Sequence, residues 1–233
     1  MTGIVLKYIA MASMLIDHIG ATFFPEMIWL RCIGRLAFPI FAFFVAEGCE
    51  KTHDIKRYAL RMVIFAVLSE FPFDLRQGVL WNPDSQNVLW TFLVAILAIW
   101  CIKKGREKGG FIYACCCVMG VLGGFLLARF LHTDYGGFGV LTVLLFWVCR
   151  GKSSEQAATF VGMFLIHWRD ALINLLRTGW LYIPVQGLCL FALPLLWFYN
   201  GKRGECSKAM QYVCYAFYPV HLLILGILLR LLH

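Results

Sequence analysis

Long apolar runs alternate with short polar segments along the whole chain. The runs are about 17 to 25 residues long, which is the length that a helix needs to cross the hydrocarbon core of a bilayer. Within each run the apolar residues are continuous rather than alternating, which favours helices over a transmembrane barrel. The pattern predicts an all-α membrane bundle of about nine helices, with about eight to ten compatible with it. The predicted helices are Ile4–Phe24, Ile28–Gly48, Lys56–Leu75, Asn87–Ile102, Gly110–Arg129, a short sixth at Phe138–Cys149, Glu155–Leu175, Trp180–Tyr199 and Met210–Leu232.

Composition agrees with burial in lipid. Of the 233 residues, 61% are hydrophobic and 15% are charged, whereas soluble domains carry about 25% charged residues. The helices use almost the whole length, so one integral membrane domain spanning residues 1–233 is expected. The first apolar run has spanning length and no small-residue cleavage site, so no signal peptide is expected.

Charge predicts how the helices are oriented. The net charge of +8 comes from short basic clusters between apolar runs, which argues against a nucleic-acid partner. These clusters fall in every even-numbered loop, and the positive-inside rule then places the N-terminus in the cytoplasm. The basic residues of the four even loops are Lys51, Lys56, Arg57 and Arg61, then Lys103, Lys104, Arg106 and Lys108, then Arg150 and Lys152, then Lys202, Arg203 and Lys208.

Polar residues gather toward the outer ends of the predicted helices. Charges inside membrane helices are costly and commonly mark functional sites, so this zone is a candidate intramembrane site. Simpler explanations stay open: arginines snorkelling to the headgroups, structural ion pairs of Glu70 or Asp74 with Arg35, and a carbonyl freed by Pro219 that His221 would satisfy. The residues of the zone are Asp17, His18, Arg31, Arg35, Glu70, Asp74, His167, Arg169, Asp170, Gln186 and His221.

Two residues of the first helix link the two sides of the membrane. Lys7 lies eleven residues before His18, and eleven steps of about 100° return to within about 20° of the starting direction. Lys7 and His18 therefore share one helix face, with Lys7 near the cytoplasm and His18 near the outside.

Several segments resemble the TraX family, which is named for a conjugation protein associated with N-terminal acetylation of pilin. They are KYIAMASMLIDHIG, LRCIGRLAFPIFAFFVAEGC, LSEFPFDL, NVLWTFL, DYGGFGVLTVLLFW and YAFYPVHLLIL. The resemblance covers nearly the whole chain, and DHIG, GR-x-AFP-x-F and YP-x-H together are specific. It implies a multi-pass protein of the bacterial cytoplasmic (inner) membrane.

The TraX family in turn looks like a distant branch of a membrane acyltransferase superfamily that includes the acyltransferase type 3 proteins and heparan-glucosaminide acetyltransferase. The spacing of Lys7 and His18 is similar to a basic or polar residue and a histidine in an early helix of those enzymes. The resemblance implies an acetyl-CoA-dependent O- or N-acyltransferase with its acceptor on the far side.

Roles for individual residues follow from that implied chemistry. A histidine titrates near working pH, so His18 suits the general base, and Lys7, Asp17 and His221 are further catalytic candidates. The candidates for holding the anionic donor are Arg31, Arg35, Lys56 and Arg57, and those for the acceptor or for support are Glu70 and Asp74.

Other classes and partners stay open. A proton-coupled transporter or channel would also carry Asp, His, Glu and Arg inside a bundle, and a non-catalytic scaffold would bind no ligand. The expected partners are acetyl-CoA, membrane lipid and an extracytoplasmic acceptor (a glycan, a lipid headgroup or a protein amine), with a homodimer possible. No metal is expected, because the Cys115–Cys117 run lacks metal-ligand spacing.

Overall fold

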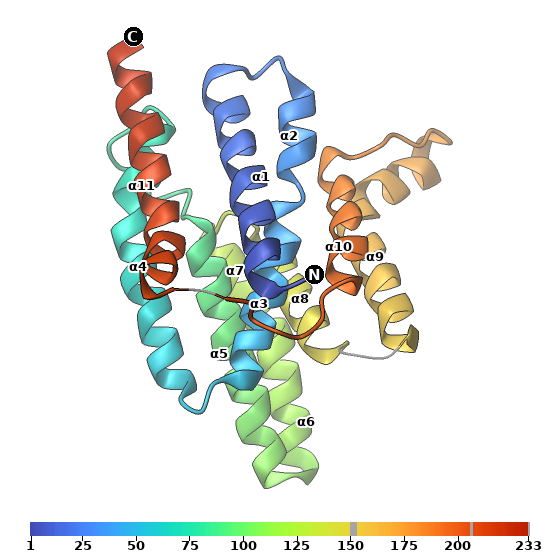
Figure 1. Cartoon of the computed structure of the whole chain (residues 1–233). Coiled ribbons are helices and arrows are strands. Elements are labelled where there is room, and N and C mark those ends of the chain that lie inside the picture. The colour runs from blue at the N-terminus through green and yellow to red at the C-terminus, as the bar shows by residue number, and fades with distance from the viewer. Residues whose placement is uncertain (150–152, 206, 233) are drawn as a thin grey trace. The chain divides into compact units, whose positions relative to one another are not determined.

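Helices joined by short connections make up the part of the chain that the computed structural model describes, which is residues 1–149, 153–205 and 207–232 (Figure 1). Within these ranges there is no strand, and an isolated bridge joins Gln86 and Thr133. The all-α prediction is confirmed. The helices are α1 (Gly3–Phe23), α2 (Ile28–Gly34), α3 (Ala37–Lys51), α4 (Ile55–Arg76), α5 (Val88–Lys108), α6 (Gly110–Val118), a π-helical turn (Met119–Gly123), α7 (Gly124–Phe130), α8 (Gly136–Val148), α9 (Ser153–Thr178), a 3-10 segment (Val185–Phe191), α10 (Ala192–Trp197) and α11 (Lys208–Leu232).

Five helical segments among the described residues are long and apolar enough to cross a membrane. Two shorter helical segments, Gly136–Val148 and Val185–Trp197, are also apolar. This arrangement supports a multi-pass membrane protein. The predicted spans at α4 and α9 fall outside the set of five. The five segments are Gly3–Phe23, Ile28–Lys51, Val88–Lys108, Gly110–Phe130 and Tyr212–Leu232.

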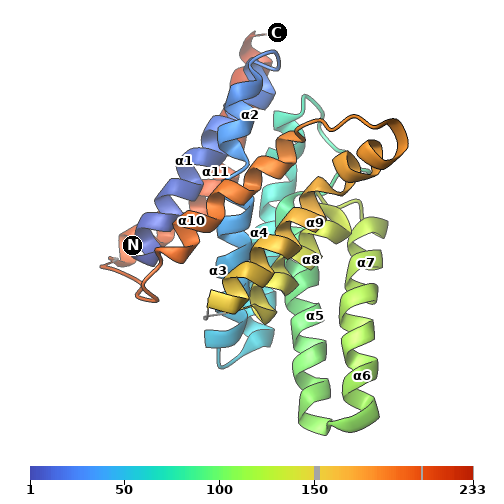
Figure 2. The ribbon, with the colours of Figure 1, turned by 90° about the vertical axis from the view of Figure 1, so that its right-hand side faces the viewer.

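The chain divides into two compact units, which we describe separately. Unit 1 comprises residues 1–41, 72–80 and 151–233, and unit 2 comprises residues 42–71 and 81–150. In unit 1, α1 packs against both α2 and α11, and the 3-10 segment packs against α9 and α2. In unit 2, α5 packs against α6, α7 and α8, and Figure 2 shows α6 and α7 as one rod alongside α5. One domain over residues 1–233 stays a prediction.

Glycines let α5 and the rod formed by α6 and α7 lie close together. Gly109 and Gly110 make the reversal between α5 and α6 with φ of 68° and 51°, a conformation that costs glycine little. A Cβ on Gly120 would lie 2.7 Å from the side chain of Ile102 on α5. The close helix contact that small residues permit in membranes therefore forms inside this chain.

Two predicted helices are interrupted. The predicted Ile28–Gly48 helix breaks at Arg35 and Leu36, between α2 and α3. Pro39 explains this break, because its nitrogen cannot donate to the Arg35 carbonyl and its ring would clash there. The predicted Trp180–Tyr199 helix is also wrong at its start, because residues 180–184 are not helical. α9 ends before Gly179, whose φ is 76°, and helical structure resumes only after Pro184.

In unit 2, the connections can be numbered as the loops between the nine predicted helices. The second, fourth and sixth connections then lie at one end of α5, and the third and fifth lie at its other end. Glu50, at the end of α3, accepts from Lys103 near the end of α5 at 3.1 Å and from the Trp147 indole of α8 at 3.1 Å. The ends that precede the second, fourth and sixth connections therefore meet. Before the start of α5, the Gln86 amide donates to the His132 carbonyl at 3.0 Å, which joins the third and fifth connections.

In unit 1, the N-terminus lies beside another even-numbered connection, the eighth. The Met1 ammonium donates to the Phe198 carbonyl at 2.7 Å, and the Gly3 amide donates to the Lys202 carbonyl at 2.9 Å. The N-terminus thus lies beside the basic eighth connection, as the charge pattern predicts. That this side faces the cytoplasm stays a prediction.

We expect Asp84 and Lys108 to lie on opposite sides of the membrane, because they flank the two ends of α5 and both are exposed. Asp84→Cys and Lys108→Cys should react with an impermeant thiol reagent from opposite sides, measured in intact cells and in inverted vesicles. The parent protein reports background labelling of native cysteines. Labelling of both variants from the same side would contradict the arrangement.

Candidate functional site

A buried carboxylate joins α1 to the end of α2. Asp17 is 7% exposed, and its Oδ2 and Oδ1 lie 2.9 Å from Arg31 Nη1 and 2.5 Å from Arg35 Nη2. The two arginines lie one turn apart, so both can reach the same carboxylate. Asp17 therefore pairs with both arginines. One carboxylate against two guanidinium groups leaves a surplus positive charge.

Small residues bring α1 and α2 close enough for this contact. A Cβ on Gly34 would lie 2.1 Å from Asp17 Oδ1, and one on Gly20 would lie 2.6 Å from Leu30 Cβ. Ser13, one turn before Asp17, donates to the Ile33 carbonyl at 2.6 Å. Gly20 of DHIG and Gly34 of GR-x-AFP therefore allow the close approach that the Asp17 contact needs. Neither segment by itself indicates this role.

The arginines differ in the donors that they leave available. Arg35 Nη1 donates to Gln186 Oε1 at 2.8 Å, which ties the 3-10 segment to α2. Arg31 uses Nη1 for both of its hydrogen bonds, to Asp17 Oδ2 and to the Asp17 carbonyl at 3.2 Å. Among the described residues, Nη2 and Nε of Arg31 and the buried Nε2 of Gln186 have no hydrogen-bond acceptor. Donors in this state can receive an oxygen of a ligand.

Two imidazoles meet beside this cluster. His18 Nδ1 of α1 lies 2.8 Å from His221 Nε2 of α11. Their ring planes differ by 6° and their centroids are 5.0 Å apart. A nitrogen separation so much shorter than the centroid separation requires the rings to lie nearly in one plane, edge to edge rather than face to face. The hydrogen bond between them is therefore directed along the lone pair.

His221 also bonds within its own helix. Its Nδ1 lies 2.6 Å from the Phe217 carbonyl, and the Phe217 ring packs parallel to the imidazole at 4.7 Å. His221 therefore does contact a backbone carbonyl, but not the one expected from the Pro219 alternative. The carbonyl that Pro219 deprives of a donor is that of Tyr215, four residues earlier, so the Phe217 contact is a separate one.

Two further basic residues matter for the imidazole pair: Arg76 acts on both rings, and Lys7 lies farther along the helix that carries His18. Arg76, at the end of α4 in unit 1, interacts electrostatically with both His18 and His221. Lys7 lies on the same continuous helix as His18, so the shared face predicted for them is retained. Along the helix axis the two are about 16 Å apart at 1.5 Å per residue.

The remaining predicted acids have different surroundings. In unit 2, Glu70 Oε2 accepts from Asn87 Nδ2 at 2.5 Å and from the Trp90 indole at 2.8 Å. Asp74 is fully buried in unit 1. Roles for Glu70 and Asp74 toward an acceptor stay predictions.

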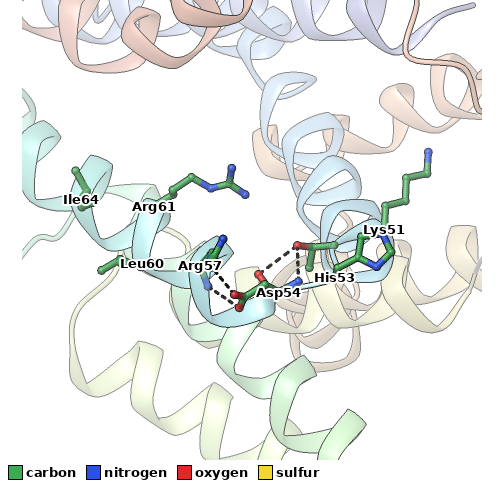
Figure 3. Close-up of a pocket in the computed structure, with 8 residues that line it drawn as sticks. Lys51, His53, Asp54, Arg57, Leu60, Arg61 and Ile64 are labelled. Carbon is green, nitrogen blue, oxygen red and sulfur yellow. Dashed lines mark hydrogen bonds and ion pairs between the residues drawn. The ribbon is translucent and has the colours of Figure 1, made fainter.

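A basic hollow of 580 Å³ lies at the turn between α3 and α4 in unit 2 (Figure 3). Arg57 lies against Asp54, with Nε and Oδ2 3.0 Å apart, and Lys51 pairs with Glu47 at 2.8 Å. Arg61, one turn beyond Arg57, has no acidic partner among the described residues. Lys56 contacts Trp100 instead of the hollow. The lining residues are Lys51, Thr52, His53, Asp54, Arg57, Leu60, Arg61 and Ile64.

Other residues of the predicted polar zone lie on α9. Arg169 pairs with its neighbour Asp170 at 3.1 Å on α9, whereas His167 is buried. Sequence reasoning missed three contributors: Ser13, Arg76 and Asn87. Ser13 had a signal in its four-residue spacing from Asp17, and Asn87 opens the NVLW segment. Arg76 follows the predicted helix end and gave no signal.

Apolar helices of spanning length, which also carry an Asp–Arg cluster and a histidine pair, indicate a multi-pass membrane protein. A family model described as "TraX protein" matches residues 2–229. The chain therefore belongs to the TraX family.

Relatives extend over different shares of the chain. It is 30% identical over 244 residues to the "Probable fimbrial assembly protein FimC, serogroup H1" of Dichelobacter nodosus, covering 94% of this chain and 92% of that protein. It is 28% identical over 139 residues to "Protein TraX" of Escherichia coli, covering 59% of this chain and 52% of that protein. No solved structure matches the chain.

Gly34→Ala should destabilise the protein, because the new methyl group would overlap the Asp17 carboxylate. Overpacking of this kind costs about 1–3 kcal/mol. Gly123→Ala is the matched control, since nothing lies within 4 Å of its added Cβ. Thermal unfolding in detergent should show a lower midpoint for Gly34→Ala than for Gly123→Ala. Equal midpoints would contradict the close approach of α2 to Asp17.

Proposed function

We propose that this protein is a membrane acyltransferase that moves an acetyl group from cytoplasmic acetyl-CoA to an acceptor at the outer side of the membrane. The observation that carries the proposal is the in-plane contact of His18 with His221 beside the Asp17 cluster. Two imidazoles and several arginines among apolar helices are more than packing requires, and charges in such a place are costly.

In this proposal His18 is the general base. Acyl transfer from a thioester needs a group that accepts the proton of the attacking amine or hydroxyl. As the new carbon–nitrogen or carbon–oxygen bond forms, the proton passes to His18, the carbon–sulfur bond breaks, and the proton then protonates the departing CoA thiolate. Lys7, on the same face nearer the other end of α1, assists in handling the donor.

Arg31 is the side chain we assign to the developing oxyanion. Its Nη2 and Nε have no acceptor among the described residues, and its side chain is 34% exposed, against 12% for Arg35. Preorganised donors in a site shielded from water stabilise such charge strongly. Arg35 and Asp17 hold Arg31 in place, so we assign them to positioning rather than to binding the CoA phosphates.

The hollow between α3 and α4 is the proposed site for the CoA phosphates. Arg57 and Arg61 supply guanidinium groups, which suit phosphate oxygens. Leu60 and Ile64 supply apolar surface for the less polar arm of the molecule. This end of α3 belongs to the basic even-numbered connections, which the positive-inside rule places in the cytoplasm with the donor.

The acceptor class draws support from a relative. The Dichelobacter nodosus protein is named as a probable fimbrial assembly protein, and fimbrial subunits are presented outside the cytoplasm. A protein amine is therefore the acceptor we favour over a glycan hydroxyl or a lipid headgroup.

Replacing His18 should remove catalysis without removing donor binding. His18→Ala should lower acetyl-CoA turnover by about 10²- to 10⁴-fold, the usual contribution of a positioned base. His18→Gln retains hydrogen bonding but cannot take up the proton, so it should be nearly as inactive. Release of CoA thiol by purified protein measures turnover, and thermal stabilisation by acetyl-CoA measures binding. A folded, ligand-binding His18→Ala protein with wild-type turnover would end the assignment.

Neutralising the hollow should weaken donor binding. Arg57→Ala/Arg61→Ala should raise the KM for acetyl-CoA far more than it lowers kcat, because phosphate contacts bind ground and transition states alike. Lys104→Ala is the matched control, since Lys104 forms an exposed pair with Glu107 on α5 away from the hollow. An unchanged KM in the folded double variant would move the phosphate site elsewhere.

A further inference from the structure

The hydrogen bonds around His18 and His221 determine which imidazole nitrogens carry protons. The Phe217 carbonyl can only accept, so His221 Nδ1, 2.6 Å away, must carry a proton. In a neutral imidazole one nitrogen donates and the other accepts. The proton on Nδ1 therefore leaves His221 Nε2 with a lone pair.

The same reasoning continues to His18. Its Nδ1 lies 2.8 Å from that lone pair in nearly the same plane, so it must be the donor. The neutral His18 ring then has its own lone pair on Nε2. Among the described residues, His18 Nε2 has no hydrogen-bond partner, and the His18 side chain is partly exposed.

We propose that His221 is a positioning residue that holds His18 in the Nδ1–H tautomer and thereby makes His18 Nε2 the proton acceptor of the site. The proposal rests on the proposed function only for what His18 does with that lone pair. The Phe217 carbonyl orients His221, and His221 orients His18. This is the task that a carboxylate performs for the histidine of a serine-protease triad, performed here by a second imidazole.

A neutral orienting group suits this part of the protein. Arg31, Arg35 and Arg76 all interact electrostatically with His18, and Asp17, the acid nearest in sequence, is already held by two arginines. When His18 accepts a proton at Nε2, its Nδ1–H still donates to His221. Transfer of the His18 Nδ1 proton to His221 Nε2 would move the positive charge to His221, which would then donate from both of its nitrogens. The two rings can therefore share the charge.

Close packing fixes the partner helix as well as the ring. A Cβ on Gly226 of α11 would lie 2.8 Å from Leu75 Cγ and 2.9 Å from the Arg76 nitrogen. The Phe217 and Tyr218 rings contact His221 with centroids 4.7 and 5.8 Å away. Side chains that are locked in this way can hold a catalytic group within the small tolerance that catalysis needs.

Nitrogen-15 NMR of histidine-labelled protein tests the tautomer directly, with His18→Ala and His221→Ala used to assign the signals. In the wild type we expect His18 to be protonated at Nδ1 and not at Nε2, with a coupling to His221 across the hydrogen bond. In His221→Phe, which retains an aromatic ring but offers no acceptor, His18 should lose this fixed tautomer. A wild-type His18 protonated at Nε2 would overturn the proposal.

Kinetics separates positioning from packing. His221→Phe should lower kcat by about 10²-fold or more with an unchanged KM for acetyl-CoA, because a wrong tautomer removes the base. His221→Gln offers an amide oxygen to His18 Nδ1–H and should recover part of the loss. Equal kcat for wild type and folded His221→Phe would overturn the proposal. If the wild-type protein has no turnover, the acyltransferase proposal fails, whereas the NMR result still decides the tautomer.

Discussion

The site of unit 1 depends on one buried carboxylate. Asp17 lies in an apolar helix, and leaving it without partners would cost about 3–5 kcal/mol. Arg31 and Arg35 satisfy it, and they reach it only because Gly34 allows α2 to approach. Since His18 follows Asp17 on the same helix, the interaction that holds α1 against α2 also fixes the axial position and rotation of His18. In the proposed function, structural and chemical roles are thus divided between the adjacent residues Asp17 and His18.

The two imidazoles extend this constraint to α11. Asp17 holds α1 and with it His18, and the Phe217 carbonyl orients His221. The two histidines that contact each other are therefore held independently. Arg31 is held by the same carboxylate and retains donors for a ligand. In the proposed reaction no large rearrangement of these side chains is needed to form the base and the oxyanion donor. Preorganisation of this kind is a principal source of catalytic power.

Much of the fold follows from the sequence, because apolar length and charge asymmetry act over whole helices. The predicted ranges matched α1, α4 and α11 closely, but the breaks at Arg35 and before Pro184 required attention to Pro39 and Gly179 as local terminators. The zone of polar residues was predictable from the positions of charges within the predicted helices, whereas the partner of Arg35 was not: the sequence suggested Glu70 or Asp74, and the structure shows Asp17. The contact between His18 and His221 was not, because it joins residues 203 positions apart and depends on which faces of α1 and α11 meet. The basic hollow likewise depends on the turn at residues 52–54, where periodicity carries no information.

In the proposed reaction, acetyl-CoA is consumed from the side of the basic connections. Acetyl-CoA does not cross bilayers, so proteoliposomes of known orientation can test the claim through release of CoA thiol. We expect turnover when acetyl-CoA is supplied to the side that carries Lys108, and none when it is supplied only to the side of Asp84. Turnover only from the Asp84 side, or none from either side with folded wild-type protein, would contradict it.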